Sequence, residues 1–91
     1  MTHLPSSMRT KRRYIHIQGG SKEAIEHVLL NNLGTFGWAK AEPLFVSVPE
    51  IDGIVLSIDR TALDNVRAAL ELSQEKMIIT RVSGTIKGLQ K

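Results

Sequence analysis

The alternation of apolar and polar residues just after a basic N-terminal stretch most constrains how this chain can fold. In Tyr14-Ile15-His16-Ile17-Gln18 the two isoleucines share one face and the other three side chains share the opposite face, which is the period of a half-buried strand. Gly19-Gly20 ends this run, and Ser21 follows as an N-cap before apolar residues at helical spacing that continue to Gly34. The pattern predicts a strand, a tight turn and a helix.

Four further elements are expected, in the order strand, strand, helix, strand. The second strand is residues 38–48, with Leu44, Val46 and Val48 on one side and Pro43 at a bulge or edge, and the third is residues 54–59. The second helix is capped by Asp59 or Thr61 and has Leu63, Val66 and Leu70 as its ridge. The last strand is residues 77–82. The complete order is two strand-helix-strand units. It predicts an α+β, ferredoxin-like or RNA-recognition-like sandwich: a four-stranded antiparallel sheet with two helices on one face.

The sheet face away from the helices is expected to be open and half apolar. The residues predicted to contact a protein partner there are Tyr14, His16, Phe45, Val55 and Ile79. RNA-recognition sheets stack bases on aromatic residues of the first and third strands. The third strand offers none, so RNA contact is expected from the basic ends and not from this face.

The composition indicates one small soluble domain. The chain has 91 residues, 42% of them hydrophobic, and contains no cysteine, which excludes disulfides and Cys-ligated zinc. It shows no apolar run of bilayer length and no signal-peptide pattern, so we expect a cytoplasmic protein without membrane contact.

The net charge of +3 conceals a strong segregation. Residues 1–13 carry four basic residues and no acid, residues 76–91 carry another four without an acid, and the middle holds nine acids against four bases. The ends are therefore +4 each and the middle is −5. Acid-free ends favour a polyanionic partner, because phosphate neutralisation releases counterions; two solubilising tails are the alternative. The predicted division is an N-terminal arm (1–13), one domain (14–83) and a glycine-containing C-terminal tail (84–91).

The residues do not assemble into a catalytic or metal-binding constellation. The histidines lack metal-ligand spacing, and the aspartates fall at turn and cap positions, so we predict no catalytic residue and no bound metal. A small acylphosphatase-like enzyme is an alternative, since Gln18-Gly19-Gly20-Ser21-Lys22 has the glycines and helix start that suit an anion. The loop lacks the arginine that ends the acylphosphatase loop. A ligand-binding regulatory domain of the same fold is a third possibility.

Both basic ends carry distinctive stretches. Residues 4–15 contain a Leu-Pro step, a later arginine and a basic-basic-tyrosine step into the first strand, and residues 82–89 read Val-Ser-Gly-Thr-Ile-Lys-Gly-Leu. Between these two stretches lie Gly53-Ile54-Val55 and Asp59-Arg60, which belong to the same sequence pattern in order and spacing. Together these stretches resemble the ribonuclease P protein component 2 family, the archaeal counterpart of the eukaryotic Pop-five subunit. The link between second helix and last strand is shorter here than in that family.

The resemblance implies a non-catalytic subunit of the ribonucleoprotein that removes the 5′ leader from precursor tRNA. In that family the RNA is the catalyst and magnesium binds at the RNA. The implied partners are the catalytic domain of the ribonuclease P RNA, protein component 3, a second copy of the chain in a heterotetramer and, indirectly, precursor tRNA. The implied RNA-contacting residues are Arg9, Lys11, Arg12, Arg13, Arg81, Ser83, Gly84, Thr85 and Lys87.

Overall fold

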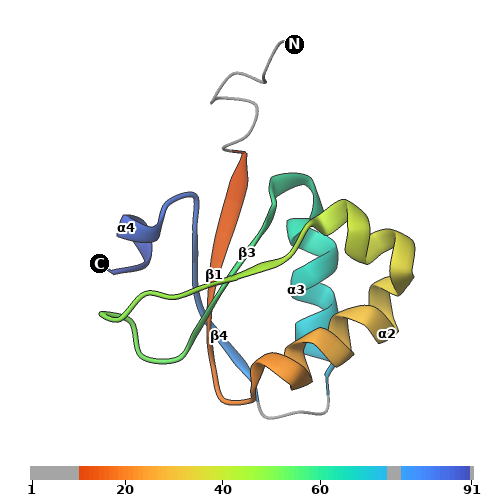
Figure 1. Ribbon diagram of the computed structural model, residues 1–91, viewed down its shortest axis with the longest axis horizontal. Helices are drawn as coiled ribbons and strands as arrows, with labels where there is room; N and C mark the ends of the chain where they lie inside the picture. Colours follow the sequence, from red (N-terminus) through yellow and green to blue (C-terminus); the bar gives the residue numbers. More distant parts are fainter. Residues whose placement is uncertain (1–10, 74–76, 91) are drawn as a thin grey trace.

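The computed structural model describes residues 11–73 and 77–90 (Figure 1). Its strands are β1 (Arg12–Gln18), β2 (Leu44–Val46), β3 (Ile54–Asp59) and β4 (Ile78–Ser83). Its helices are α2 (Lys22–Ala41), α3 (Leu63–Leu72), which follows a single 3-10 turn η1 (Arg60–Ala62), and the short α4 (Ile86–Leu89). None of the helices in these ranges is long and apolar enough to cross a membrane.

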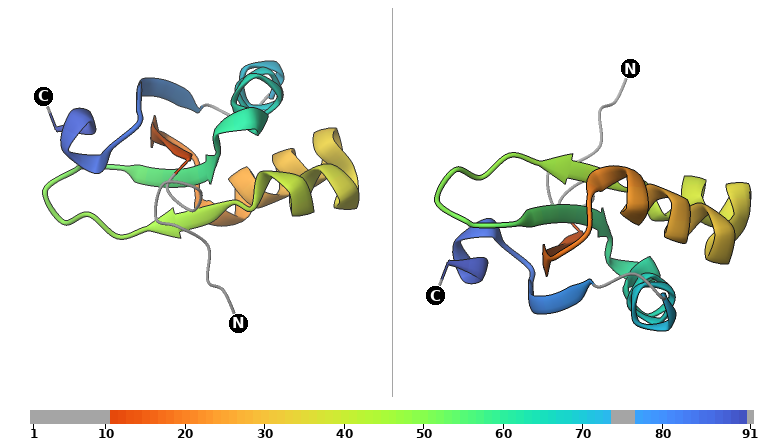
Figure 2. Two further views of the ribbon diagram at one scale, coloured as in Figure 1. Left: turned by 90° about the horizontal axis from the view of Figure 1, so that it is seen from above. Right: turned by 90° about the horizontal axis from the view of Figure 1, so that it is seen from below.

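The strands form one sheet in the order β2-β3-β1-β4, and every neighbouring pair is antiparallel. Helices α2 and α3 lie together on one side of this sheet, as Figures 1 and 2 show from three directions. The structure thus confirms the predicted ferredoxin-like α+β sandwich with a four-stranded antiparallel sheet.

The core lies between the sheet and these two helices. β1 contributes Ile15 and Ile17 and β3 contributes Leu56 and Ile58, all four without solvent exposure, as alternation predicted. The helices contribute the remaining fully packed residues of this cluster: Ile25, Val28, Leu29, Ala41, Val66, Ala69 and Leu70.

Helix α2 continues beyond the position at which the sequence predicted its end. Gly34 adopts a left-handed backbone (φ 73°, ψ 174°), but helical geometry resumes and runs to Ala41. Residues 38–41, expected to begin a strand, are helical because Trp38 and Ala41 pack against the core. Glu42, also left-handed (φ 48°), ends the helix by donating its backbone N–H to the carbonyl of Trp38 (3.1 Å).

Strand β2 is short and faces opposite to the prediction. Phe45 pairs with Leu56 of β3, and directly paired residues of antiparallel strands point to the same side of the sheet. Phe45 therefore packs against the core under the helices, whereas Leu44 and Val46 lie on the other face. The predicted position of Phe45 on the open face is wrong, because the register of β2 against β3 sets Phe45 beside the buried Leu56. Val48 lies beyond the end of β2.

The start of the second helical segment matches the prediction. The Asp59 carboxylate accepts hydrogen bonds from the backbone N–H of Thr61 (3.0 Å) and from its hydroxyl. These bonds, with smaller contributions from Arg12 and Arg60, lower the pKa of Asp59 below its usual value of 3.8. Asp59 is thus the N-cap of the turn that leads into α3.

The two boundaries at the chain ends differ from the sequence prediction. β1 begins at Arg12 and not at Tyr14, and the expected irregular tail contains α4. Leu89 of α4 is only 5% exposed. Helix α4 and the loop between β2 and β3 lie on the side of the strands opposite α2 and α3 (Figures 1 and 2), so the tail does add to the fold.

Candidate nucleic-acid interface

The described parts of the two basic ends, residues 11–13 and 77–90, lie side by side at one end of the sheet, where β1 begins and β4 ends. β1 and β4 are hydrogen-bonded neighbours, and Tyr14 pairs with Ser83. The guanidinium of Arg13 lies against Gly84, where a Cβ would come within 3.3 Å of its Nη1 atom. Residues that are about 70 positions apart in the sequence are therefore in contact here. The β-ladder produces this proximity, because the first and last strands of this fold are neighbours.

The residues after β4 form a compact capped turn. The Ser83 hydroxyl accepts a hydrogen bond from the backbone N–H of Thr85 (3.2 Å), and the Thr85 hydroxyl caps α4 by accepting from the N–H of Gly88 (3.0 Å). A Cβ at Gly88 would overlap the Ser83 hydroxyl, so only glycine fits there. The Ser and Thr hydroxyls thus position α4.

Four of the predicted RNA-contacting cations lie in the described ranges without an ion pair to any described acid: Lys11, Arg13, Arg81 and Lys87. Lys11, Arg81 and Lys87 are exposed, and Arg13 is half-buried. Arg13 donates to the carbonyl of Arg12 (3.0 Å) and Arg81 donates to that of Gly88 (3.4 Å), which orients both side chains without neutralising them. Arg9 lies outside the described residues.

Arg12 differs from these four cations because its side chain is used inside the fold. It is only 15% exposed and lies 3.6 Å from a carboxylate oxygen of Glu42. It donates from Nε to the hydroxyl of Ser57 (3.0 Å), and from Nη2 to the carbonyls of Ser57 (3.0 Å) and Glu42 (2.6 Å). Arg12 thereby ties β1 to β3 and to the end of α2. Nothing in the local sequence marks this role, because its partners are 30 and 45 residues away.

The predicted open face for a protein partner is not assembled as expected. Phe45 and Ile79 pack against the core on the helix side, Ile79 because it pairs with Ile17. Val55 and His16 do lie on the other face but are only 2% and 9% exposed. The β2–β3 loop and α4, which formed from the predicted tail, cover this part of the sheet (Figure 2). Of the predicted set, Tyr14 is the member that lies on this face and is half-buried and not buried.

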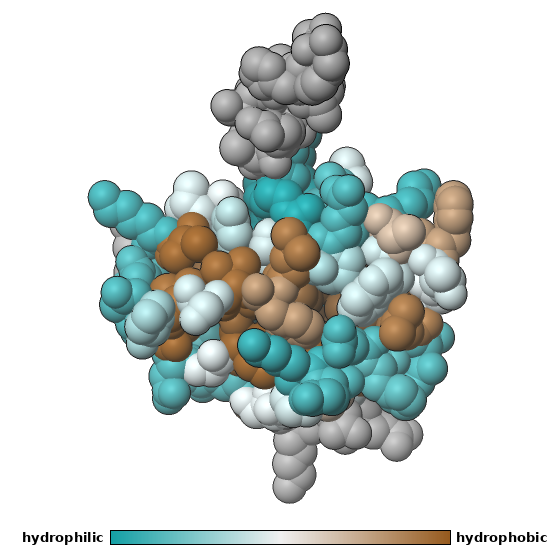
Figure 3. Space-filling view, viewed as in Figure 1, coloured by the Kyte–Doolittle hydropathy of each residue, from teal (hydrophilic) through white to brown (hydrophobic). Residues whose placement is uncertain are grey.

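Apolar residues nevertheless reach the surface beside this covered region. Figure 3 shows them over β2 and the loop that follows it, framed by hydrophilic residues. Leu44 is 61% exposed there, and Ile51 of the loop is half-buried.

The glycine loop between β1 and α2 is used as a helix start. The Ser21 hydroxyl accepts from the backbone N–H of Ala24 (3.1 Å), and the Lys22 ammonium lies over the Phe45 ring, 5.8 Å from its centroid. A Cβ at Gly20 would meet the Met77 side chain, so this side chain closes one side of the loop. These contacts give the loop a structural role and leave the acylphosphatase alternative without a specific observation in its favour.

The part of the chain that the structure describes holds no group of three or more His, Asp or Glu side chains that could bind a metal ion. The predicted absence of a catalytic residue stays a prediction. What the arrangement offers chemically is a set of cations that no described acid neutralises, two of them oriented by backbone carbonyls, with backbone groups of glycines beside them. Such a surface suits phosphate oxygens.

Comparison with known proteins finds a protein of similar sequence. The chain is 32% identical over 81 residues to ribonuclease P protein component 2 of Methanococcus maripaludis (strain C7 / ATCC BAA-1331). The similarity covers 79% of this chain and 62% of the Methanococcus protein, so the chain spans less than two thirds of that relative's length. No family model matches the chain.

Proposed function

We propose that this chain is a protein subunit of ribonuclease P, of the component 2 family, the archaeal counterpart of the eukaryotic Pop-five subunit. In this role it supports the catalytic RNA during removal of the 5′ leader from precursor tRNA. The similarity to the Methanococcus protein supports the family, and the fold suits it. The RNA, with its magnesium, supplies the chemistry, and the protein supplies no catalytic side chain.

The observation that carries the proposal is the meeting of the two basic ends. Each end resembles the family by itself, and the β1–β4 pairing brings Arg13 against Gly84 at the start of the capped turn. Arg81 lies in β4 and Lys87 in α4, and neither forms an ion pair with an acid of the described ranges. Phosphate contacts by such cations give affinity that falls with salt, because each contact releases counterions.

The proposal includes the partners that the family resemblance implies. They are the catalytic domain of the ribonuclease P RNA, protein component 3 and a second copy of the chain, with precursor tRNA contacted indirectly. The basic surface at Arg13 and Lys87 is assigned to the RNA. We expect the protein to act where the RNA does, in the cytoplasm.

RNA binding tests the basic surface directly. We expect the double variant Arg13→Ala, Lys87→Ala to bind ribonuclease P RNA more weakly and to reduce the slope of log affinity against log salt by about one to two. The matched control is Arg67→Ala, which removes an exposed arginine of α3 that pairs with Glu71. An unchanged slope in the double variant would contradict the assignment of this surface to RNA.

Reconstitution tests the function. The chain, combined with a protein component 3, should raise cleavage of precursor tRNA by a ribonuclease P RNA at low magnesium. No increase would overturn the proposal. Turnover of an acyl phosphate by the protein alone would instead favour the small-enzyme alternative, and the absence of any salt-dependent RNA affinity would favour a regulatory domain of the same fold.

A further inference from the structure

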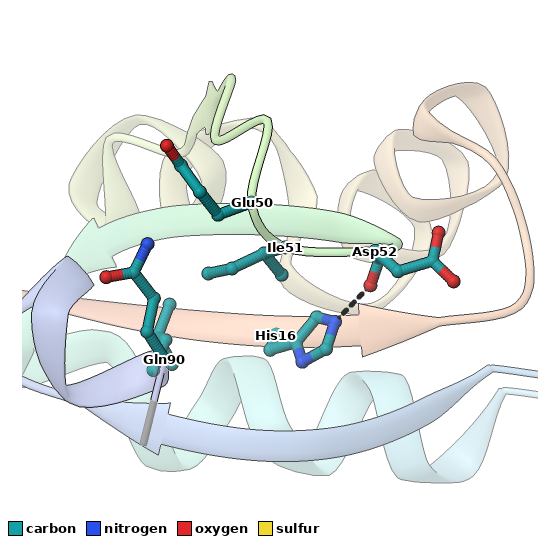
Figure 4. Close-up of a pocket in the computed structure, with 6 residues that line it drawn as sticks. His16, Glu50, Ile51, Asp52 and Gln90 are labelled. Atoms are coloured by element: carbon teal, nitrogen blue, oxygen red, sulfur yellow. Dashed lines mark hydrogen bonds between the residues drawn. The ribbon is translucent and has the colours of Figure 1, made fainter.

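A cavity of about 420 Å³ lies on the sheet face opposite α2 and α3, between the β2–β3 loop and the C-terminal segment (Figure 4). Its lining residues come from three distant parts of the sequence: His16, Glu50, Ile51, Asp52, Leu89 and Gln90. This volume is in the range of pockets that hold small organic ligands. The basic surface described above does not include these residues.

His16 forms the floor of the cavity and is held in one orientation. Its Nε2 atom lies 2.5 Å from the backbone carbonyl oxygen of Asp52, and a carbonyl only accepts, so Nε2 carries the hydrogen. Among the described residues no buried side-chain nitrogen or oxygen lacks a partner. The Nδ1 atom has no hydrogen bond to a described residue, so it is not completely buried.

The loop wall is held close to this histidine by Gly53. Its φ of +108° is unfavourable for other residues, and a Cβ there would come within 2.8 Å of the Ile17 carbonyl and 3.1 Å of His16 Nε2. The approach of the loop to β1 is therefore fixed by backbone geometry. A cavity whose wall and floor are fixed in this way is already shaped before a ligand arrives.

The walls combine apolar surface with hydrogen-bonding groups at the rim. Ile51 and Leu89 supply aliphatic surface. In Figure 4 the amide of Gln90 stands on one side of the rim and Glu50 on the other, with its carboxylate turned outward. The amide both donates and accepts, and the carboxylate accepts. Aliphatic contacts with polar groups at the edge suit a flat heteroaromatic ring that carries an amino group.

A cation stands next to the cavity. Arg81 pairs directly with His16 across the β1–β4 ladder, so both side chains emerge on the same face of the sheet. Its guanidinium is oriented by the carbonyl of Gly88, one residue before the cavity wall at Leu89. If the base of a nucleotide lay over His16, the Arg81 guanidinium would be beside it and could contact the phosphate of the same nucleotide.

We propose that this cavity binds one unpaired nucleobase with an exocyclic amino group, its flanking phosphate facing Arg81. The inference rests on the proposed function, since it makes a single-stranded nucleotide of the partner RNA the ligand. Proteins commonly read unpaired RNA bases by splaying them into such pockets and bonding their edges. Uracil, which has no amino group to donate to Glu50, binds more weakly than cytosine.

Nuclear magnetic resonance titration of the full chain tests the proposal. CMP, AMP, GMP and UMP are added separately, with inorganic phosphate as the reference anion. We expect CMP to shift the amides of Ile51, Asp52 and Gln90, with weaker effects from UMP, and phosphate to affect only the region of Arg81. The variant Gln90→Ala should weaken CMP binding about three- to tenfold, the loss expected for one or two hydrogen bonds.

The matched control is Asn31→Ala, which removes an exposed side-chain amide from α2 on the other side of the sheet and should leave CMP binding unchanged. Equal shifts from phosphate and all four nucleotides, or equal affinity of the Gln90→Ala variant, would overturn the base pocket. If RNA binding and reconstitution succeed while nucleotides leave the cavity unchanged, the pocket inference alone fails. If CMP binds but reconstitution fails, the proposed function fails and the pocket stands.

Discussion

Arg12 and Arg13 are adjacent, chemically identical and both part of the basic N-terminal stretch, yet we expect their removal to have opposite consequences. Arg12→Ala deletes three hydrogen bonds and a contact with the Glu42 carboxylate, and it leaves the hydroxyl of Ser57, a residue only 3% exposed, without its donor. Arg13→Ala deletes one bond to a neighbouring carbonyl. Arg12 should therefore control stability, and Arg13 should control RNA affinity.

The magnitude follows from these contacts. A hydrogen bond from a charged group contributes about 1.5–3 kcal/mol and an orphaned buried partner costs about 1–3 kcal/mol, but the bonds of one side chain are not additive. We expect Arg12→Ala to lower the free energy of unfolding by about 2–4 kcal/mol, a large part of the total of about 5–14 kcal/mol for a chain of this length. In a domain of this size that corresponds to a fall in Tm of about 10–30 °C.

Thermal unfolding followed by circular dichroism, with RNA affinity measured at 10 °C, separates the two roles. Arg12→Lys keeps the charge but loses the planar fork, so we expect it to be nearly as unstable as Arg12→Ala. Arg13→Ala should change Tm by less than about 5 °C and still weaken RNA binding. The reasoning would be refuted if Arg12→Ala kept the wild-type Tm and lost more RNA affinity than Arg13→Ala.

Three further changes test other parts of the structure. Asp59→Ala should cost about 1 kcal/mol at pH 7, because it removes the cap on Thr61. The lowered pKa of Asp59 means that this stabilisation is present above pH 3.8 and is lost as pH falls through the folded-state value, so urea unfolding of wild type and variant should converge at low pH. Gly88→Ala should destabilise by about 1–3 kcal/mol in urea titrations because of overlap with Ser83, and adding Ser83→Ala should recover part of that loss. Leu29→Ala, in the fully buried face of α2, should cost about 2–5 kcal/mol in the same measurement, and a smaller loss would contradict the assigned core.

Elements whose signal is local could be predicted from the amino-acid sequence alone. Alternation fixed β1 and β3 and their buried faces, and Ser21 and Asp59 fixed two helix starts, because a cap bonds to a backbone group only two or three residues away. The order of these elements was enough to identify the fold, since few topologies satisfy it without crossing connections.

The extent of α2 and the orientation of β2 depend on contacts with residues far away in the sequence, so they became evident only in the folded structure. Gly34 looked like a helix end, but the burial of Ala41 makes continuation of the helix favourable. Because α2 extends to Ala41, β2 is short and begins only at Leu44. Within it, Phe45 points toward the core between the sheet and the helices. Local patterns contain no information on these contacts, because the stabilisation comes from side chains on other elements.

The two basic ends show this division most clearly. Their charge was evident from the sequence, and the resemblance named a partner for both. The β1–β4 pairing places them side by side. Arg12 is not available to a ligand, because its side chain contacts Glu42 and Ser57. The expected tail contains a helix whose Leu89 is buried. Charge is a property of each residue, whereas availability to a ligand depends on which groups the fold brings against it.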